Sequence, residues 1–192
     1  MGVYETIISR RTIRKFSQDE IKQEILVRLI NAGRLAPSAA NLQPLQYFVI
    51  NNKGLKEKIF PNLTWAGYIN PEGNPKKGER PVTYIIILAD KSMNKSPELD
   101  VGASAMSISL AAHEVGIGCC WVLAFKKKQV NEMIIIPDGI SAEMIIALGY
   151  PVEKPVAEDI GKGRPIKYYK DSLGTLHVPK RKLEDIAHFN KF

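Results

Sequence analysis

The chain has 192 residues, of which 45% are hydrophobic and 24% are charged. This balance is typical of one globular domain with a buried core, and it excludes a disordered segment. Lysine and arginine outnumber aspartate and glutamate by 27 to 20, a net charge of +7, which favours an anionic or phosphate-bearing partner. The basic residues are scattered and do not alternate with aromatic side chains as on a nucleic-acid-binding face, so we expect no nucleic-acid partner.

The sequence also argues against export, membrane insertion and metal binding. The amino terminus lacks a continuous apolar stretch with a cleavage site, and nowhere do 18 apolar residues follow one another. The cysteines are the adjacent pair Cys119 and Cys120, which cannot supply a disulfide framework or a four-ligand metal site. We therefore expect a cytoplasmic protein with no membrane segment and no metal.

Two helices are predicted in the first 36 residues. Residues 3–9 form a short amphipathic helix that ends at the basic pair Arg10-Arg11. Residues 17–20, Ser-Gln-Asp-Glu, have the spacing of a capping box and predict the start of a second helix. Its apolar residues recur on one side as far as Ile30, and it must stop before Pro37.

The next segment alternates between short elements and loops. Residues 37–44 are a polar loop bounded by proline at both ends, residues 46–50 read as a strand, and a lysine-rich helix runs to about Phe60. Residues 61–81 are rich in proline and glycine and carry Trp65 and Tyr68. Long loops of this kind in compact domains are usually functional lids or disordered segments.

The core elements follow. Residues 82–89 are a near-continuous apolar run and predict a buried strand. Residues 98–115 predict a helix covered with alanine and serine on most sides, which suits a buried helix that another helix approaches closely, either in the same chain or in a second copy. Residues 117–123 and 142–148 predict two more strands, with a helix between them that starts near Lys126.

The composition changes to proline, lysine and glycine after Pro151. Residues 166–178 look like an exposed hairpin with a turn at 171–174. We expect one domain over residues 1–192, in which residues 155–192 form a tail that wraps a partner subunit.

The common enzyme motifs are missing from the sequence. It has no GxGxxG, GxxxxGK[ST], HExxH or GxSxG pattern. His113, His177 and His188 lie far apart in sequence, and we interpret the first as a core or boundary residue and the others as surface residues. We therefore expect no catalytic side chain, and a bound cofactor that carries the chemistry.

Two segments contain side chains suited to such a cofactor. Residues 9–16, SRRTIRKF, place guanidinium groups and a hydroxyl at the end of a helix, a combination that suits a phosphate. Residues 36–44, APSAANLQP, form a rigid loop with side chains that can hydrogen-bond the edge of a planar ring. Taken alone, the first could equally be a solvated basic turn and the second an ordinary connection.

Together the two segments closely resemble the amino-terminal signature of the FMN-dependent nitroreductase family. The resemblance continues through Leu99–Ala103, through residues 115–125 (VGIGCCWVLAF), through residues 147–151 (ALGYP) and through residues 178–184 (VPKRKLE), so it spans essentially the whole chain. It implies an α+β, three-layer α/β/α fold with a mostly antiparallel central sheet flanked by helices, and a C-terminal tail exchanged between the subunits of a homodimer.

The resemblance also implies roles for individual residues. Arg10, Arg11 and Thr12 would hold the FMN phosphate and ribityl chain, and Arg14 would approach the N1–C2 edge of the flavin and stabilise the reduced ring. The remaining cofactor-binding residues would be Pro37, Ser38, Asn41 and Gln43 from the other subunit, the backbone of Leu123 and Ala124, and Lys180 and Arg181 from the tail. Trp65 and Tyr68 would shape the substrate pocket.

The implied activity is an FMN-dependent NAD(P)H oxidoreductase. NADH or NADPH would deliver hydride to flavin N5, and a nitroaromatic, a quinone or another small electron-poor acceptor would then be reduced. The sequence leaves three alternatives open: a dehydrogenase or dehalogenase of the same fold with a dedicated substrate, a flavin-binding protein without turnover, and a basic nucleic-acid-binding domain. No sequence motif identifies the natural acceptor or a preference between NADH and NADPH.

Overall fold

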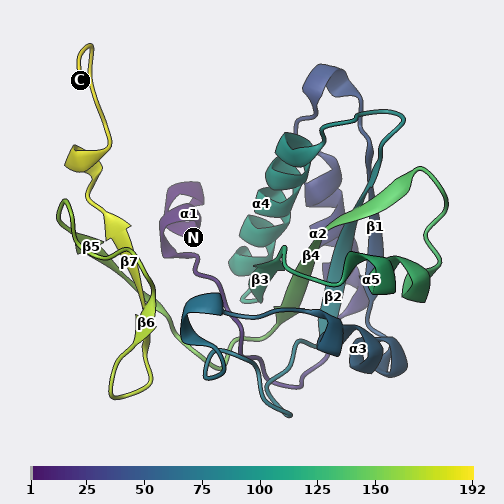
Figure 1. Ribbon diagram of the computed structural model, residues 1–192, viewed down its shortest axis with the longest axis horizontal. Helices are drawn as coiled ribbons and strands as arrows, with labels where there is room; N and C mark the ends of the chain where they lie inside the picture. Colours follow the sequence, from purple (N-terminus) through teal and green to yellow (C-terminus); the bar gives the residue numbers. More distant parts are fainter. Residues whose placement is uncertain (1) are drawn as a thin grey trace.

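The computed structural model describes residues 2–192 (Figure 1). Its core comprises α1 (Val3–Ser9), α2 (Gln23–Arg34), β1 (Leu45–Ile50), α3 (Lys53–Ile59), β2 (Thr83–Asp90), α4 (Glu98–Glu114), β3 (Gly118–Val122), α5 (Lys127–Ile134) and β4 (Ile140–Gly149). A second group of strands follows near the carboxyl end: β5 (Val156–Ile160), β6 (Tyr169–Lys170) and β7 (Leu176–Arg181).

The centre of the described part is a four-stranded sheet in the order β1-β2-β4-β3, with every neighbouring pair antiparallel. The apolar run predicted at residues 82–89 is β2, whose residues are buried from Thr83 to Ala89. Successive side chains of a strand point to opposite faces, so Ile85 and Ile87 pack on the face covered by α2 and α4, while Ile86 packs on the other face with α3 and α5. The predicted three-layer α+β fold with a mostly antiparallel sheet is confirmed.

Helix α4 is buried on one side only. Val101, Ala105, Ile108 and Ala112 are fully covered by the core. On the opposite side, Leu99 is 86% exposed. Within one chain, the structure buries only one face of α4. Burial of the other sides by a second copy stays a prediction.

The predicted capping box at residues 17–20 is wrong. The hydroxyl of Ser17 donates to the carboxylate of Asp19, and α2 begins at Gln23 instead. The backbone explains this difference. The Phe16 N–H donates to Glu79 O at 3.0 Å and the Ser17 N–H donates to Tyr150 O at 2.8 Å, so residues 16 and 17 are held in an extended conformation and cannot begin a helix.

The tail forms a separate small sheet in the order β5-β7-β6. Strands β6 and β7 are the predicted hairpin, whose turn is held by Asp171 Oδ1 accepting from the N–H groups of Leu173 and Thr175. Strand β5, parallel to β7, was not predicted, because its sequence VAEDI lacks apolar alternation. In Figure 1 the small sheet stands to one side of the core, and residues 183–192 extend away from it. None of the described helices is long and apolar enough to cross a membrane.

Candidate functional site

The basic segment after α1 runs alongside the edge of the central sheet. Thr12 forms a parallel bridge with Cys119, and the Ile13 N–H donates to Cys119 O at 2.9 Å. A side chain at Gly118 would collide with Ile13, so the close approach requires glycine. We call residues 10–16 the arm. Phe16, 0% exposed, anchors its far end against the backbone of Gly149.

The arm and the tail together line a groove of about 610 Å³. The predicted residues Arg10, Arg11, Thr12, Arg14 and Lys180 all lie on it. We call this cavity the arginine groove; its other lining residues are Ile7, Ile8, Ala157, Asp159, Tyr168 and Val178. Residues from opposite ends of the chain therefore meet here, as the sequence predicts for a phosphate site.

The positive charges of this groove lack counter-ions among the described residues. Among the described residues, Arg10, Arg11, Arg14 and Lys180 have no ion-pair partner. The Nε atoms of Arg11 and Arg14 are buried and lack a hydrogen-bond partner in residues 2–192. Burial and then the charge of Arg10 lower the pKa of Arg11. An anion with several oxygens would relieve the repulsion and satisfy the free donors, so these residues fit a phosphate-bearing group.

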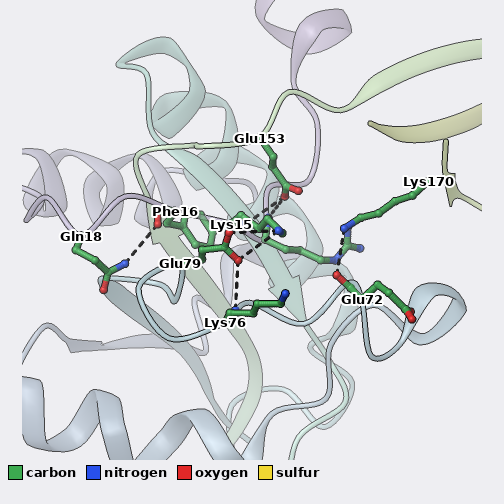
Figure 2. Close-up of polar contacts among 9 residues, drawn as sticks. Lys15, Phe16, Gln18, Glu72, Lys76, Glu79, Glu153 and Lys170 are labelled. Carbon is green, nitrogen blue, oxygen red and sulfur yellow. Dashed lines mark hydrogen bonds and ion pairs between the residues drawn. The ribbon is translucent and has the colours of Figure 1, made fainter. Parts of the chain in front are cut away.

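Two contacts fix Arg14. Its backbone N–H donates to Glu153 Oε1 at 2.6 Å, and the same oxygen accepts from the Lys15 N–H at 3.2 Å. Its guanidinium lies over the ring of Tyr168, 5.2 Å from the centroid. The side chain of Lys15 pairs with Glu79 at 3.3 Å, which joins the arm to the loop before β2 (Figure 2).

The loop at residues 36–44 is a second, separate feature. Asp100, 4% exposed in the first turn of α4, accepts from the Ser38 hydroxyl at 3.2 Å and from the Ala39 N–H at 3.0 Å. Positive φ angles at Ala40, Asn41 and Gln43 complete the tight loop. Asp100 therefore positions this loop, a contact that the sequence analysis did not predict although Asp100 lies within the resemblance at Leu99–Ala103.

This loop borders its own smaller hollow of about 120 Å³. Pro37, Ser38 and Gln43 line it, and Asn41 does not. It shares no lining residue with the arginine groove. The structure of one chain therefore does not bring the two predicted halves of the site together.

The remaining predicted residues lie outside the arginine groove. Arg181 donates to Asp185 O at 2.9 Å. Leu123 is 66% exposed at the end of β3, and the carbonyl of Ala124 accepts from the Thr64 N–H at 2.9 Å. Arg181 is therefore not among the described residues that line the arginine groove, and its contact with the phosphate stays a prediction.

The two aromatic residues of the 61–81 loop differ in position. Trp65 is 4% exposed and stacks on Phe60 at 5.7 Å, so it is a core residue. Tyr68 is 60% exposed, and its ring lies 5.0 Å from that of Tyr168. Tyr168 lines the arginine groove and also contacts Arg14, a role that its place in an apparently exposed hairpin did not indicate.

Comparisons with known proteins agree with this arrangement. Residues 7–150 match the model of the nitroreductase family. A protein of Methanothermobacter thermautotrophicus, provisionally named NADH dehydrogenase/NAD(P)H nitroreductase, is 32% identical over 167 residues, which cover 83% of each chain. The solved FMN-dependent nitroreductase of Clostridium difficile R20291 is 27% identical, with a TM-score of 0.67 and coverage of 98% of this chain and 99% of that one.

A more distant relative is named for a different activity. The iodotyrosine deiodinase of Thermotoga neapolitana is 23% identical over 165 residues, covering 78% of this chain and 88% of its own. The extent of the family match, together with the groove that the arm and the tail build, decides the classification. The chain belongs to the nitroreductase family.

Proposed function

We propose that this chain is an FMN-dependent NAD(P)H oxidoreductase that reduces nitroaromatics, quinones or similar small electron-poor acceptors. The observation that carries the proposal is the arginine groove, with four cations that lack ion-pair partners among the described residues and two buried, unpartnered guanidinium nitrogens. Membership of the nitroreductase family supports FMN as the occupant, since relatives bear the names FMN-dependent nitroreductase and NAD(P)H nitroreductase.

The roles of the groove residues follow from their positions. Arg10, Arg11 and Lys180 would bind the phosphate of FMN, and Thr12 would hydrogen-bond its ribityl chain. Arg14 would place its charge at the ring, where negative charge gathers on reduction. Bound FMN would supply the hydride-transfer chemistry between NADH or NADPH and the acceptor. The protein side chains bind, orient and tune, and no protein acid or base is assigned.

We further propose a homodimer in which the site is shared. The hollow lined by Pro37, Ser38 and Gln43 would face the partner's arginine groove, so that the two halves of the site meet across the interface. Asn41 and the backbone of Leu123 and Ala124 would lie at its edge, and Tyr68 would border the acceptor. Trp65 would support the acceptor pocket from within the core. The chain would be a single domain, and its tail would wrap the partner.

The decisive experiment is spectroscopic and kinetic. The purified protein should be yellow, release FMN on denaturation and oxidise NADH or NADPH when menadione or a nitroaromatic is supplied. A colourless protein that takes up no FMN would overturn the assignment. A yellow protein with no turnover would support the flavin-binding alternative.

A second candidate function is reductive dehalogenation, favoured by the similarity to an iodotyrosine deiodinase. Release of iodide from iodotyrosine by the reduced protein, at a rate above that of nitroaromatic reduction, would favour this candidate.

A further inference from the structure

A second large cavity lies away from the arginine groove. It has a volume of about 540 Å³ and is enclosed by α3, by residues 77–81 and by the start of β2. Its size is within the range of about 300–1,000 Å³ that is usual for small-molecule pockets. It has no lining residue in common with the arginine groove. The family resemblance assigns nothing to it.

The cavity is strongly cationic. Lys53, Lys56, Lys77 and Arg80 line it, and the acidic side chain among its lining residues is Glu57. In residues 2–192 none of these five side chains has an ion-pair partner. Four positive charges against one negative charge leave a local excess of +3. Unpaired cations gathered around a concave surface attract an anion of more than one charge.

The lining of the cavity also includes a tyrosine hydroxyl. Tyr84 is 1% exposed and lines the cavity, and its hydroxyl has no hydrogen-bond partner in the described part of the chain. The hydroxyl oxygen is accessible from the cavity, so it can donate a hydrogen bond to a bound group. Burial raises the pKa of Tyr84, which keeps the phenol protonated as a donor.

Arg80 presents a second unsatisfied donor. Its guanidinium lies over the ring of Phe60, 4.0 Å from the centroid, and its Nε is buried with no partner among residues 2–192. Its backbone is fixed as well, because Gln18 Nε2 donates to Arg80 O at 3.0 Å and to Phe16 O at 3.3 Å. The contact between Gln18 and Phe16 is drawn in Figure 2. The same amide therefore joins the wall of the cavity to the arm.

From this geometry we propose that the cavity binds a phosphate monoester of a small organic group, in a site separate from the arginine groove. The lysines and Arg80 complement a doubly charged phosphate, and the Tyr84 hydroxyl donates to one of its oxygens. The remaining space and the apolar surface of Pro81 accept the organic part. This site does not depend on the proposed redox function.

The first test uses adenosine 5′-monophosphate as the probe, titrated by calorimetry into the FMN-loaded protein. Loading with FMN keeps the phosphate region of the arginine groove filled. We expect saturable binding of one molecule per chain that weakens as salt rises, and much weaker binding of adenosine, which lacks the phosphate. Equal binding of the two compounds, or no binding of either, overturns the proposal.

Three variants locate the site. Lys56→Gln removes one lining charge and Tyr84→Phe removes only the hydroxyl. Lys58→Gln is the matched control, because Lys58 is an exposed lysine of the same helix that does not line the cavity. We expect Lys56→Gln and Tyr84→Phe each to weaken binding about fivefold or more, and Lys58→Gln to change it less than about twofold.

The pattern among the variants decides the result. If all three variants weaken binding equally, the ligand responds to general surface charge and the cavity is not its site. If neither lining variant changes binding, the probe occupies another place and the proposal fails. Melting temperatures of the variants identify any change that reflects loss of folding. Because Tyr84→Phe keeps the buried ring, it retains the packing of the core.

Discussion

Arg10, Arg11 and Arg14 lie within five residues of one another on an extended arm, with their positive charges unpaired. Such crowding costs free energy, and here burial lowers the pKa of Arg11. An anion among the guanidinium groups would offset this repulsion. Arg11 also donates to the carbonyls of Ile8 and Arg10 at 2.7 and 2.6 Å, so it fixes the end of α1. Arg10 is therefore the cleaner probe of phosphate binding.

The first prediction concerns that phosphate. Arg10→Ala should weaken the binding of oxidised FMN about tenfold or more, because a hydrogen bond to a charged group contributes about 1.5–3 kcal/mol. Arg181→Ala is the matched control and should have a much smaller effect, since Arg181 lies off the groove and donates to Asp185 O. Flavin fluorescence on titration measures both affinities. Equal losses would show that Arg181 reaches the phosphate after all.

The second prediction concerns Arg14. Its charge would face a ring that is neutral when oxidised and anionic when reduced, so Arg14→Ala should lower the flavin midpoint potential more than it weakens oxidised FMN. Arg14→Lys should restore most of the potential. Spectroelectrochemical titration gives the potential of each variant. A loss of oxidised FMN as large as that of Arg10→Ala, with an unchanged potential, would contradict this division of roles.

At the residue scale, the sequence predicted the groove side chains that adjoin a motif and missed those that act through tertiary contacts. Arg10, Arg11, Thr12 and Arg14 form a local pattern, so the sequence could place them together on one groove. Asp100, Tyr168 and Glu153 contribute through contacts with residues 62, 154 and 139 positions away along the chain, respectively. Nothing local marks such contacts before the fold is known.

Among the elements, the small sheet of the tail is held by one charged cluster. His177 on β7 lies 3.1 Å from Glu158 on β5 and 3.1 Å from Asp171 in the β6–β7 turn, one carboxylate at each ring nitrogen. Its ring stacks on that of Tyr169 at 4.9 Å. Both nitrogens must carry protons to donate to both carboxylates, so the cluster requires the imidazolium form.

The third prediction is the pH dependence of this cluster. The hydrogen bond to Asp171, followed by that to Glu158, raises the pKa of His177. A raised pKa in the folded state contributes stability below the ordinary value of about 6.5, and that stability is lost as the pH rises through the folded value. The pKa of Asp171 is lowered, chiefly by the hydrogen bond to His177. The stability that Asp171 contributes is therefore present above the ordinary carboxyl pKa of 3.8 and is lost as the pH falls through the folded value.

Melting temperatures of the wild type and of His177→Gln test this dependence. The melting temperature of the wild type should exceed that of the variant most near about pH 6, and the difference should disappear in alkaline solution. A difference that stays constant with pH would mean that the imidazole acts through its stacking on Tyr169 and not through its charge.

The elements differ in how well periodicity predicted them. Strand β2 was found almost to the residue because its continuous burial leaves a long apolar run, and helix α4 because its buried face carries a long run of small residues. Strand β5 was missed, since VAEDI lacks apolar alternation and contacts β7 through the backbone ladder and the polar Glu158–His177 pair. The capping box failed because contacts from residues distant in sequence, Glu79 and Tyr150, hold Phe16 and Ser17 extended.

At the scale of the whole molecule, several large apolar side chains are exposed on the helices. On α1, Val3 and Tyr4 are 77% and 69% exposed, and on α4 Leu99 is 86% exposed. Exposed large apolar side chains that gather on a surface can mark an interface. Because they lie on the elements beside the arm, they support a homodimer in which a second chain covers α1 and α4.

The carboxyl-terminal segment carries the last prediction. Residues 156–180 supply groove residues to the arm of the same chain, whereas Leu183 and Phe189 in the extended end are 76% and 84% exposed. If that end wraps a partner, cutting the chain after Lys182 should weaken the dimer while each groove keeps its lining residues. Cutting after Pro155 should also abolish FMN binding, because it removes Tyr168 and Lys180. Sedimentation across a range of concentrations and flavin content measure the two effects separately. A chain ending at Lys182 that dimerises and melts like the wild type would show that the apolar end does not contact the partner.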